Sequence, residues 1–257
     1  MFAVVLYHGI DDGSGSDRAM NPIDREYVLD RRHFEQHVEY LATTRAAGVG
    51  VIVSFDDGDL SGYTLAAPIL EQHGLRGEFF IVTGWIGRPG FMSAAQLRDL
   101  AARGHGIHSH SRTHRRLPDL TRQEIDDELR RSKDDLELLL GSPVGLFSIP
   151  GGAFDDRVIE TASYAGYSAV LSSIEGYNNG RDDSFVLRRF AARSYSTVSM
   201  LAAICEHPLY TSMRLTAKRM LLGAVRGGLG RSAYERLRGR VIASLPATSG
   251  PKRPHRE

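Results

Sequence analysis

The sequence predicts an α/β protein with a mainly parallel sheet, followed by a helical C-terminal appendage. Two observations carry this prediction. Short runs rich in β-branched and aromatic residues alternate with amphipathic stretches, which is typical of βα units. After about residue 195 the strand signals stop, while helical patterns continue.

Seven runs are predicted to be strands because each combines β-branched or aromatic residues with flanking turn residues. They are Ala3–Tyr7, Val49–Phe55, Glu78–Val82, Gly106–Ser109, Gly145–Ile149, Tyr167–Leu171 and Phe185–Phe190. In a parallel sheet built from βα units, functional residues gather where the strands end and the loops begin. Candidate site residues are therefore sought directly after these runs.

Helices are expected between the strands, where start signals precede amphipathic stretches. The signals are Asp30 and two capping boxes, Ser93 with Gln96 and Thr121 with Glu124. Further helical pieces are expected at 198–206, 212–222 and 232–243. We therefore predict a main domain over residues 1–195 and a basic helical extension over residues 196–257 with a disordered end.

Composition and charge narrow the function classes. The 257 residues are 42% hydrophobic and 25% charged, as in soluble globular proteins, and no run approaches 18 consecutive apolar residues. Eleven Lys and Arg against three Glu make residues 200–257 basic and leave the rest acidic. An acidic body does not suit a phosphate backbone, so no nucleic-acid partner is expected. The basic extension suits either a peripheral contact with an anionic membrane or a solvated helical face.

Cys205 is the single cysteine, so an internal disulfide and a thiolate zinc site are both excluded. Any metal would be held by histidine and carboxylate side chains. The N-terminal apolar run, Phe2–Tyr7, is short, lacks a preceding basic region and is followed by acidic residues, unlike a secretory signal. A cytoplasmic location is therefore expected, at the membrane surface if the extension binds lipid.

The segment SFDDG at 54–58 places two adjacent carboxylates, Asp56 and Asp57, directly after a buried strand. Adjacent acids at a strand end can divide the work of a hydrolase, one binding a cation and the other acting as general base. Asp-Gly pairs are also common in ordinary turns, and Asp11–Gly13 repeats the DDG pattern. This motif therefore does not decide the function by itself.

Four histidines lie within residues 105–114, in the segment HGIHSHSRTH. One helical turn after the strand would bring His110 and His114 to the same side, as two metal ligands require. Two histidines and one carboxylate leave coordination positions open, which is the arrangement of a catalytic site. A polar surface loop is the alternative, and His105 is interpreted as structural.

Pro150, Gly151 and Gly152 form a turn after the predicted strand Gly145–Ile149. Glycines permit close backbone approach, so this turn could present N–H groups to a developing oxyanion. The same residues are an ordinary loop in most proteins, which is the alternative interpretation.

In their order and spacing, these motifs resemble those of the polysaccharide deacetylases (carbohydrate esterase family 4, NodB homology domain). SFDDG resembles the first motif of the family and HSRTH the second, and residues 67–110 are similar throughout. The resemblance implies a distorted (β/α) barrel, Asp56 as general base, and Asp57, His110 and His114 as ligands of one divalent metal. Zinc is expected from the ligand types, and nickel, cobalt and manganese accept similar sets.

The last motif of the family, Leu-x-His, carries the histidine that protonates the leaving amine, and none follows residue 180. Leu6-Tyr7-His8 has this pattern at the end of the first strand, as in the circularly permuted subset that includes poly-N-acetylglucosamine deacetylases. This resemblance implies that His8 is the general acid. A packed or capping histidine is the alternative for His8, and His207 is the competing acid.

Two positions depart from the family pattern. The Arg that normally pairs with the catalytic base is Ser148 here, which leaves the orientation of Asp56 open. The Trp of the family's fourth motif is also missing, since the single Trp is Trp85. Four aromatic residues are available to replace it, although each also suits a core or surface position: Tyr164, Tyr167, Tyr177 and Phe190.

Together these features predict a metal-dependent carbohydrate N-deacetylase, which removes N-acetyl groups from amino sugars of a saccharide or glycan precursor. An intracellular, lipid-linked precursor of a bacterial exopolysaccharide fits the expected location. A non-catalytic glycan-binding module on a decayed deacetylase scaffold is the alternative, favoured by the missing Arg and Trp. A metal-dependent phosphoesterase is disfavoured because the sequence offers no convincing second ligand cluster.

Overall fold

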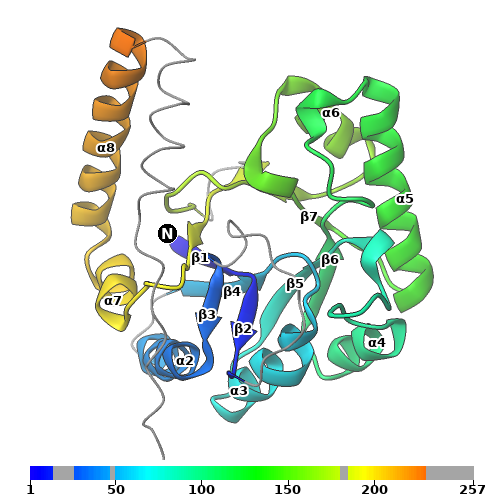
Figure 1. Ribbon diagram of the computed structural model, residues 1–257, viewed down its shortest axis with the longest axis horizontal. Coiled ribbons are helices and arrows are strands. Elements are labelled where there is room, and N and C mark those ends of the chain that lie inside the picture. Colours follow the sequence, from blue (N-terminus) through cyan, green and yellow to red (C-terminus); the bar gives the residue numbers. More distant parts are fainter. Residues whose placement is uncertain (14–25, 47–49, 180–184, 230–257) are drawn as a thin grey trace, which may run out of the picture. The chain divides into compact units, whose positions relative to one another are not determined.

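A computed structural model describes residues 1–13, 26–46, 50–179 and 185–229 (Figure 1). An eight-stranded parallel sheet curls into a half-barrel, which confirms the predicted α/β class and the distorted barrel. The strand order is β10-β1-β4-β5-β6-β7-β8-β9. The strands are β1 Phe2–Tyr7, β4 Gly50–Phe55, β5 Gly77–Ile81, β6 Gly106–Ser109, β7 Leu146–Ser148, β8 Ala169–Leu171, β9 Val186–Leu187 and β10 Phe190–Ala191.

The last predicted strand, Phe185–Phe190, is wrong in one respect, because the structure divides it into two strands. β9 pairs with β8 at one end of the strand order, and β10 pairs with β1 at the other end. Two residues, Arg188 and Arg189, connect Leu187 to Phe190 and so carry the chain from one edge of the sheet to the other. This crossing draws the two edges of the half-barrel together.

A second, smaller sheet follows β1 and was not predicted. β2 (Gly9–Asp11) pairs with β3 (Val28–Asp30) in parallel, with Gly9 opposite Val28. Figure 1 shows the two strands side by side. Because only His8 separates β1 from β2, this small sheet lies at the carboxyl end of β1.

Helices and short helical turns connect the strands, and both predicted capping boxes form, at Ser93 and at Thr121. α8 begins at Pro208, whose fixed φ suits the first turn of a helix. The expected helix at 232–243 lies outside the described residues. The helices are α2 Arg31–Ala46, α3 Ala67–Gln72, α4 Ala94–Ala102, α5 Arg122–Leu140, α6 Asp156–Tyr164, α7 Val198–Glu206 and α8 Pro208–Leu229, with a π-helical turn at Gly62–Ala66 and 3₁₀ turns at Thr83–Trp85, Leu117–Asp119 and Pro150–Gly152.

Alternating strand residues face the two sides of the sheet, as the period of a strand requires. One set joins the large core shared with the helices, where the rings of Tyr7 and Phe55 stack with centroids 5.5 Å apart and those of Phe55 and Phe79 at 4.8 Å. The other set forms a small apolar cluster that includes Val4 and Phe80. Just past the carboxyl ends of the strands, the positions that continue this second set are polar, and they include His8, Asp56 and His110. The predicted site therefore lies at this end of the sheet.

Contacts divide the chain into two compact units, Met1–Thr211 and Ser212–Glu257. α7 belongs to the first unit, because Leu201 and Cys205 are buried in its core and the helix packs against α2. The boundary predicted at residue 195 between a main domain and an extension stays a prediction. Among the described residues, the helices are all too short or too polar to span a membrane.

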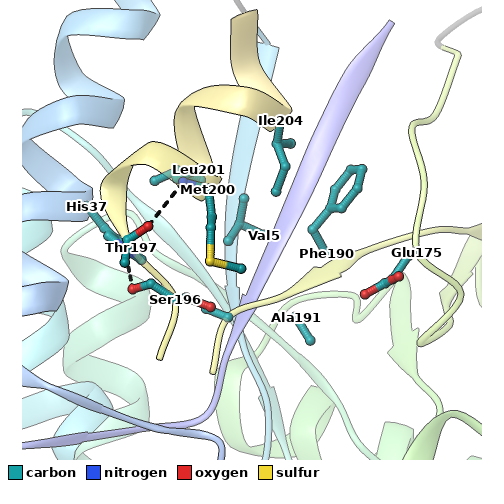
Figure 2. Close-up of a pocket in the computed structure, with 11 residues that line it drawn as sticks. Val5, His37, Glu175, Phe190, Ala191, Ser196, Thr197, Met200, Leu201 and Ile204 are labelled. Atoms are coloured by element: carbon teal, nitrogen blue, oxygen red, sulfur yellow. Dashed lines mark hydrogen bonds between the residues drawn. The ribbon is translucent and has the colours of Figure 1, made fainter. Parts of the chain in front are cut away.

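A cavity of about 110 Å³ lies between β1, β10 and α7 (Figure 2). Its lining is mainly apolar and includes Phe190 and Met200, with Glu175 at one side. Nε2 of His37 lies 3.1 Å from the Ser196 carbonyl at another side. The residues predicted for catalysis and metal binding do not line this cavity, so it is distinct from the candidate site.

Candidate active site

The three predicted metal ligands, Asp57, His110 and His114, converge at the carboxyl ends of β4 and β6. Oδ1 of Asp57 lies 3.4 Å from Nε2 of His110 and 3.4 Å from Nε2 of His114. This oxygen is buried and has no hydrogen-bond partner among the described residues. Ligand atoms about 2.1 Å from a tetrahedral metal lie about 3.4 Å apart, so the buried oxygen and the two imidazole nitrogens fit one divalent ion.

The segment HSRTH reaches this arrangement through a loop, and the helical turn expected there is wrong. Ser111 and His114 both adopt left-handed backbone conformations with φ of 62°, and Asp57 does so with φ of 74°. Such conformations are uncommon for residues other than glycine and concentrate at functional sites. The kinks aim the two imidazoles at Asp57, which a regular helix was expected to do.

Residues around the ligands hold them in place. Nδ1 of His110 donates a hydrogen bond to the Ser148 carbonyl oxygen at 2.8 Å, which leaves Nε2 with the lone pair that binds a metal. The loop that carries His114 is held by Glu128 of α5, a buried residue. Its carboxylate accepts hydrogen bonds from the backbone N–H groups of Arg112 at 2.9 Å and Thr113 at 2.8 Å, and from the Thr113 hydroxyl.

Asp56 is paired with an arginine, although the sequence suggested that this partner was missing. Nη1 of Arg189 donates to Oδ1 of Asp56 at 2.8 Å, and Nη2 donates to Oδ2 at 2.9 Å. The hydroxyl of Ser148 also donates to Oδ2 at 2.9 Å. Arg189 is itself held by the Ser172 carbonyl oxygen, which accepts from Nε at 3.1 Å. The carboxylate of Asp56 is therefore fixed by residues from two other strand ends.

This environment keeps the acids ionised. Burial alone would raise the pKa of Asp56, but the charges of Arg189 and His110 and the hydrogen bonds from Arg189 together outweigh burial and hold that pKa below its ordinary value. Burial also acts to raise the pKa of Asp57, but the nearby side chains of His110, His8 and His114 lower that pKa instead. An ionised Asp56 can accept a proton, as a general base requires.

His8 lies at the same rim, one residue past the end of β1. The backbone N–H of Asp56 donates to the Tyr7 carbonyl oxygen at 3.1 Å, so the residues after β1 and β4 remain side by side. Burial lowers the pKa of His8, and the charges of Asp57 and Asp56 oppose this effect. The competing acid, His207, stands at the end of α7.

The turn Pro150–Gly152 follows β7, as predicted, and its backbone is kinked at Gly151, which is not helical. Gly151 and Gly152 have φ of 60° and 69°, and a Cβ at Gly152 would lie 2.3 Å from the Ser173 hydroxyl oxygen. Glycine is therefore required at Gly152. The N–H of Gly152 already donates to the Ile149 carbonyl oxygen at 2.9 Å, so this group is not free for an oxyanion.

Aromatic residues flank the site, but they differ from the four expected. The ring of Trp85 lies 5.1 Å from that of His114 and 4.8 Å from that of Phe91. On the other side, the ring of Tyr27 lies 4.8 Å from that of His8. Sequence reasoning missed Trp85 because its usual motif was absent, although its position just after a predicted strand was a usable signal. No sequence pattern pointed to Tyr27.

The four expected aromatic residues have other contacts. Tyr167 donates its hydroxyl hydrogen to the Leu129 carbonyl oxygen, and Tyr177 donates to the Ile204 carbonyl oxygen. Phe190 lines the cavity of Figure 2, and Tyr164 is 75% exposed on α6. His105 is structural, as predicted, because it accepts from the Gly77 N–H at 3.0 Å through Nδ1 and contacts Glu71 through Nε2 at 2.9 Å.

Comparison with known proteins agrees with this geometry. Residues 45–170, which contain both motifs, match the family model described as polysaccharide deacetylase. This part of the chain belongs to the polysaccharide deacetylase family. The deacetylase is 22% identical over 221 residues to YxkH of Bacillus subtilis, an alignment that covers 79% of this chain and 75% of YxkH.

Two further comparisons concern more divergent or shorter matches. The deacetylase is 28% identical over 124 residues to a peptidoglycan-N-acetylglucosamine deacetylase of Bacillus cereus, covering 48% of this chain and 56% of that protein. Its fold is similar to that of the Streptococcus pyogenes deacetylase PplD, solved in complex with acetate, with a TM-score of 0.70 and 19% identity over 80% of this chain and 98% of that one. The family match and the Asp-His-His triad together identify a carbohydrate deacetylase with a candidate metal site.

Proposed function

We propose that this protein removes N-acetyl groups from amino sugars of a saccharide or glycan precursor, with one divalent metal at the Asp57, His110 and His114 triad. The observation that carries the proposal is the pairing of two arrangements at one rim. The buried Oδ1 atom of Asp57, which accepts no hydrogen bond from the described residues, faces two imidazoles. Beside it, the carboxylate of Asp56 is fixed by Arg189. A lectin would need neither arrangement, so Arg189 removes the main argument for the glycan-binding alternative.

Each residue has a defined task in the hydrolysis of the acetamide. A divalent cation, when bound, supplies a Lewis acid for the acetyl carbonyl and lowers the pKa of a water molecule. Asp56 accepts a proton from the attacking water, and Arg189 keeps its carboxylate oriented. His8 donates a proton to the nitrogen as the carbon–nitrogen bond breaks, so acetate and a free amine leave. The backbone N–H of Gly151 is the remaining donor of the turn Pro150–Gly152 for the developing oxyanion.

The position of His8 supports a permuted arrangement of the family's motifs. β1 lies between β10 and β4 in the sheet, and it carries His8 at the same rim as Asp56. In a curled sheet, the first and last strands are neighbours, so a strand that moves between the chain's two ends can keep its place in the site. We therefore infer that β1 replaces the final strand that carries the acid in the unpermuted pattern.

Zinc is the proposed metal because two imidazoles and one carboxylate match its preferred ligands. The test combines metal content with activity. Purified protein should hold about one metal per chain, and the His110→Ala His114→Ala double variant should lose it. The rate of acetate release from acetylated chitooligosaccharides should rise with the metal content. Loading the protein with zinc, nickel, cobalt or manganese in turn identifies the ion that gives the highest rate.

Two further variants separate binding from chemistry. Asp56→Asn and His8→Ala should keep the metal and lower acetate release by about 100-fold or more, because each removes one proton-transfer group. Loss of the metal in both variants would contradict the assigned roles. Protein that stays metal-free after incubation with all four ions, yet binds chitooligosaccharides, would instead support the glycan-binding alternative.

The basic extension is proposed to contact an anionic membrane surface. α8 exposes Leu209, Met213 and Met220, whose spacing places them along one side of the helix. Vesicles that contain phosphatidylglycerol should sediment with the protein, and Met213→Glu Met220→Glu should abolish this binding. If this variant sediments with the vesicles as much as the parent protein does, the proposed membrane contact through this face of α8 is wrong. The cytoplasmic location and the lipid-linked substrate stay predictions.

A further inference from the structure

Tyr27 is placed against His8 by the small sheet. β2 and β3 are parallel, with Gly9 opposite Val28, so the residues immediately before them, His8 and Tyr27, are also neighbours. Their ring centroids lie 4.8 Å apart at an interplanar angle of 47°. Contacts between aromatic rings whose centroids are about 4.5 to 7 Å apart add to the stability that burial alone gives. The register therefore fixes a ring contact at the residue proposed as general acid.

Tyr27 also contacts Arg193. The guanidinium carbon of Arg193 lies 5.4 Å from the centroid of the Tyr27 ring, within the range of a cation–π contact. Arg193 also forms an ion pair with Glu26, and the backbone N–H of Ser194 donates to the Glu26 carbonyl oxygen at 2.8 Å. The turn before β3 is thus tied to the segment after β10, and the Tyr27 ring contacts both His8 and Arg193.

Among the described residues, no hydrogen bond holds the Nδ1 side of the His8 ring. Its Nδ1 atom is buried and makes no hydrogen bond within the described part of the chain, whereas Nδ1 of His110 is fixed by the Ser148 carbonyl oxygen. The second side-chain torsion of histidine is broad, so a ring without a hydrogen bond needs packing to define its orientation. The aromatic contact that the structure gives His8 is with Tyr27.

We propose that Tyr27 is a positioning residue that orients the His8 imidazole toward the departing amine, with the cation–π contact from Arg193 holding the Tyr27 ring in place. This inference rests on the proposed function. Tyr27 takes no proton in the reaction, since the proton passes from His8 to the amine nitrogen as the carbon–nitrogen bond breaks. The ring of tyrosine is the active feature, so phenylalanine should replace it and alanine should not.

The test compares two substrates that differ in their need for an acid. An N-acetylated amine leaves only with a proton, whereas 4-nitrophenyl acetate releases a stabilised phenolate that needs none. On an acetylated chitooligosaccharide, Tyr27→Ala should lower kcat by about 10-fold to 100-fold with little change in KM, which is a part of what general acid catalysis contributes. On 4-nitrophenyl acetate the same variant should stay within about 3-fold of the parent enzyme, and Arg193→Met should show a smaller loss in the same pattern.

Matched controls make the pattern specific. Tyr27→Phe should retain both activities, and Tyr164→Ala, which removes an exposed tyrosine from α6, should change neither. His8→Ala should show the same split between substrates as Tyr27→Ala, with a larger loss. In spectra of protein with labelled histidine, the ring carbon–hydrogen resonances of His8 should shift in Tyr27→Ala but not in Tyr27→Phe, because the ring current of Tyr27 is lost.

Equal losses on both substrates in Tyr27→Ala, or an unmoved His8 resonance, would overturn the inference while His8→Ala still shows the split. A rise in KM with no change in kcat would also overturn the inference, since it would mean that Tyr27 contributes to substrate binding. Failure of the proposed function is recognised separately. In that case the metal-loaded parent enzyme itself would release no acetate from N-acetylated saccharides, whatever its action on the ester, and both proposals would fall.

Discussion

The hydroxyl oxygen of Ser148 accepts a hydrogen bond at 2.8 Å from Nη2 of Arg189, a residue 41 positions further along the chain. Ser148 occupies the position where the resemblance expects an arginine, and the arginine that approaches it follows β9 instead. The small side chain leaves the space that the guanidinium fills. An arginine from the connection between β9 and β10 therefore performs the pairing with Asp56 that the resemblance assigns to a motif arginine.

Removing Arg189 should damage stability and activity together. Arg189 and Asp56 are 1% and 3% exposed, so Arg189→Met leaves a buried carboxylate without its cation, at a cost of about 3 to 5 kcal/mol in the free energy of unfolding. Acetate release should fall by about 100-fold because the general base loses its orientation. Urea unfolding of the metal-free protein measures the first effect, and a single-substrate assay the second.

The double variant Asp56→Asn Arg189→Met provides the control for this pair. It removes both charges, so it should recover part of the stability lost in Arg189→Met while remaining inactive. If the single and double variants unfold at the same urea concentration, then Arg189 does not compensate the charge of Asp56.

Glu128→Gln should weaken metal binding although Glu128 is not a ligand. The carboxylate accepts three hydrogen bonds from Arg112 and Thr113, and a glutamine would turn an NH₂ group toward one of those donors. The loop that carries His114 should then lose its fixed position, and metal affinity should fall by about 10-fold to 100-fold. Competition with a chromophoric chelator measures the affinity.

Asp127→Asn is the matched variant for that experiment. It removes one negative charge from the same helix, α5, at an exposed ion pair with Arg131. Its metal affinity should equal that of the parent protein. An equal fall in both variants would mean that the charge of α5, and not the loop contact, acts on the metal.

Glu71 should contribute a pH-dependent part of the stability. Its carboxylate accepts from Nε of Arg103 at 2.8 Å and contacts Nε2 of His105 at 2.9 Å. The hydrogen bond from Arg103 lowers the pKa of Glu71 from 4.5 to about 2. Because the folded-state pKa is depressed, the stabilisation is complete above about pH 4.5 and is lost as the pH falls toward 2.

Urea unfolding at several pH values tests this contribution. Glu71→Gln should lower the free energy of unfolding by about 1 kcal/mol at pH 7, since partial exposure screens the pair, and by less as the pH approaches 2. Glu35→Gln, which breaks an exposed pair with Arg31, should have a much smaller effect at every pH. A difference between Glu71→Gln and the parent protein that is constant with pH would contradict the assignment.

The sequence was sufficient to predict those site residues that lie in local motifs directly after strands. Asp56, Asp57 and His110 directly follow predicted strands, so their place at one rim could be predicted from the strand pattern. The conformation of the HSRTH loop could not, because left-handed backbone at Ser111 and His114 has no signature in residue type. Arg189 was missed because it lay inside a run interpreted as one strand, and its role depends on the break between β9 and β10.

Long-range partners account for the remaining differences. Tyr27 meets His8 only through the pairing of β2 with β3, two strands too short to give a periodic signal. Trp85 meets His114 because Thr83 and Gly84 donate backbone hydrogen bonds to the carbonyl oxygens of Ser111 and Arg112. Neither contact follows from local pattern, since both depend on how separate loops meet after the sheet has curled.

The pairing of β1 with β10 separates the assembly of the site into an early and a late event. The three candidate metal ligands follow β4 and β6, which join through β5 over a short stretch of chain. His8 and Arg189 meet the site only after strands from opposite ends of the chain have paired. Contacts between distant segments form slowly because a long loop must close first. Under the proposed function, the metal site therefore forms before the proton-transfer residues are in place, and a folding intermediate between the two events would bind the cation without hydrolysing substrate.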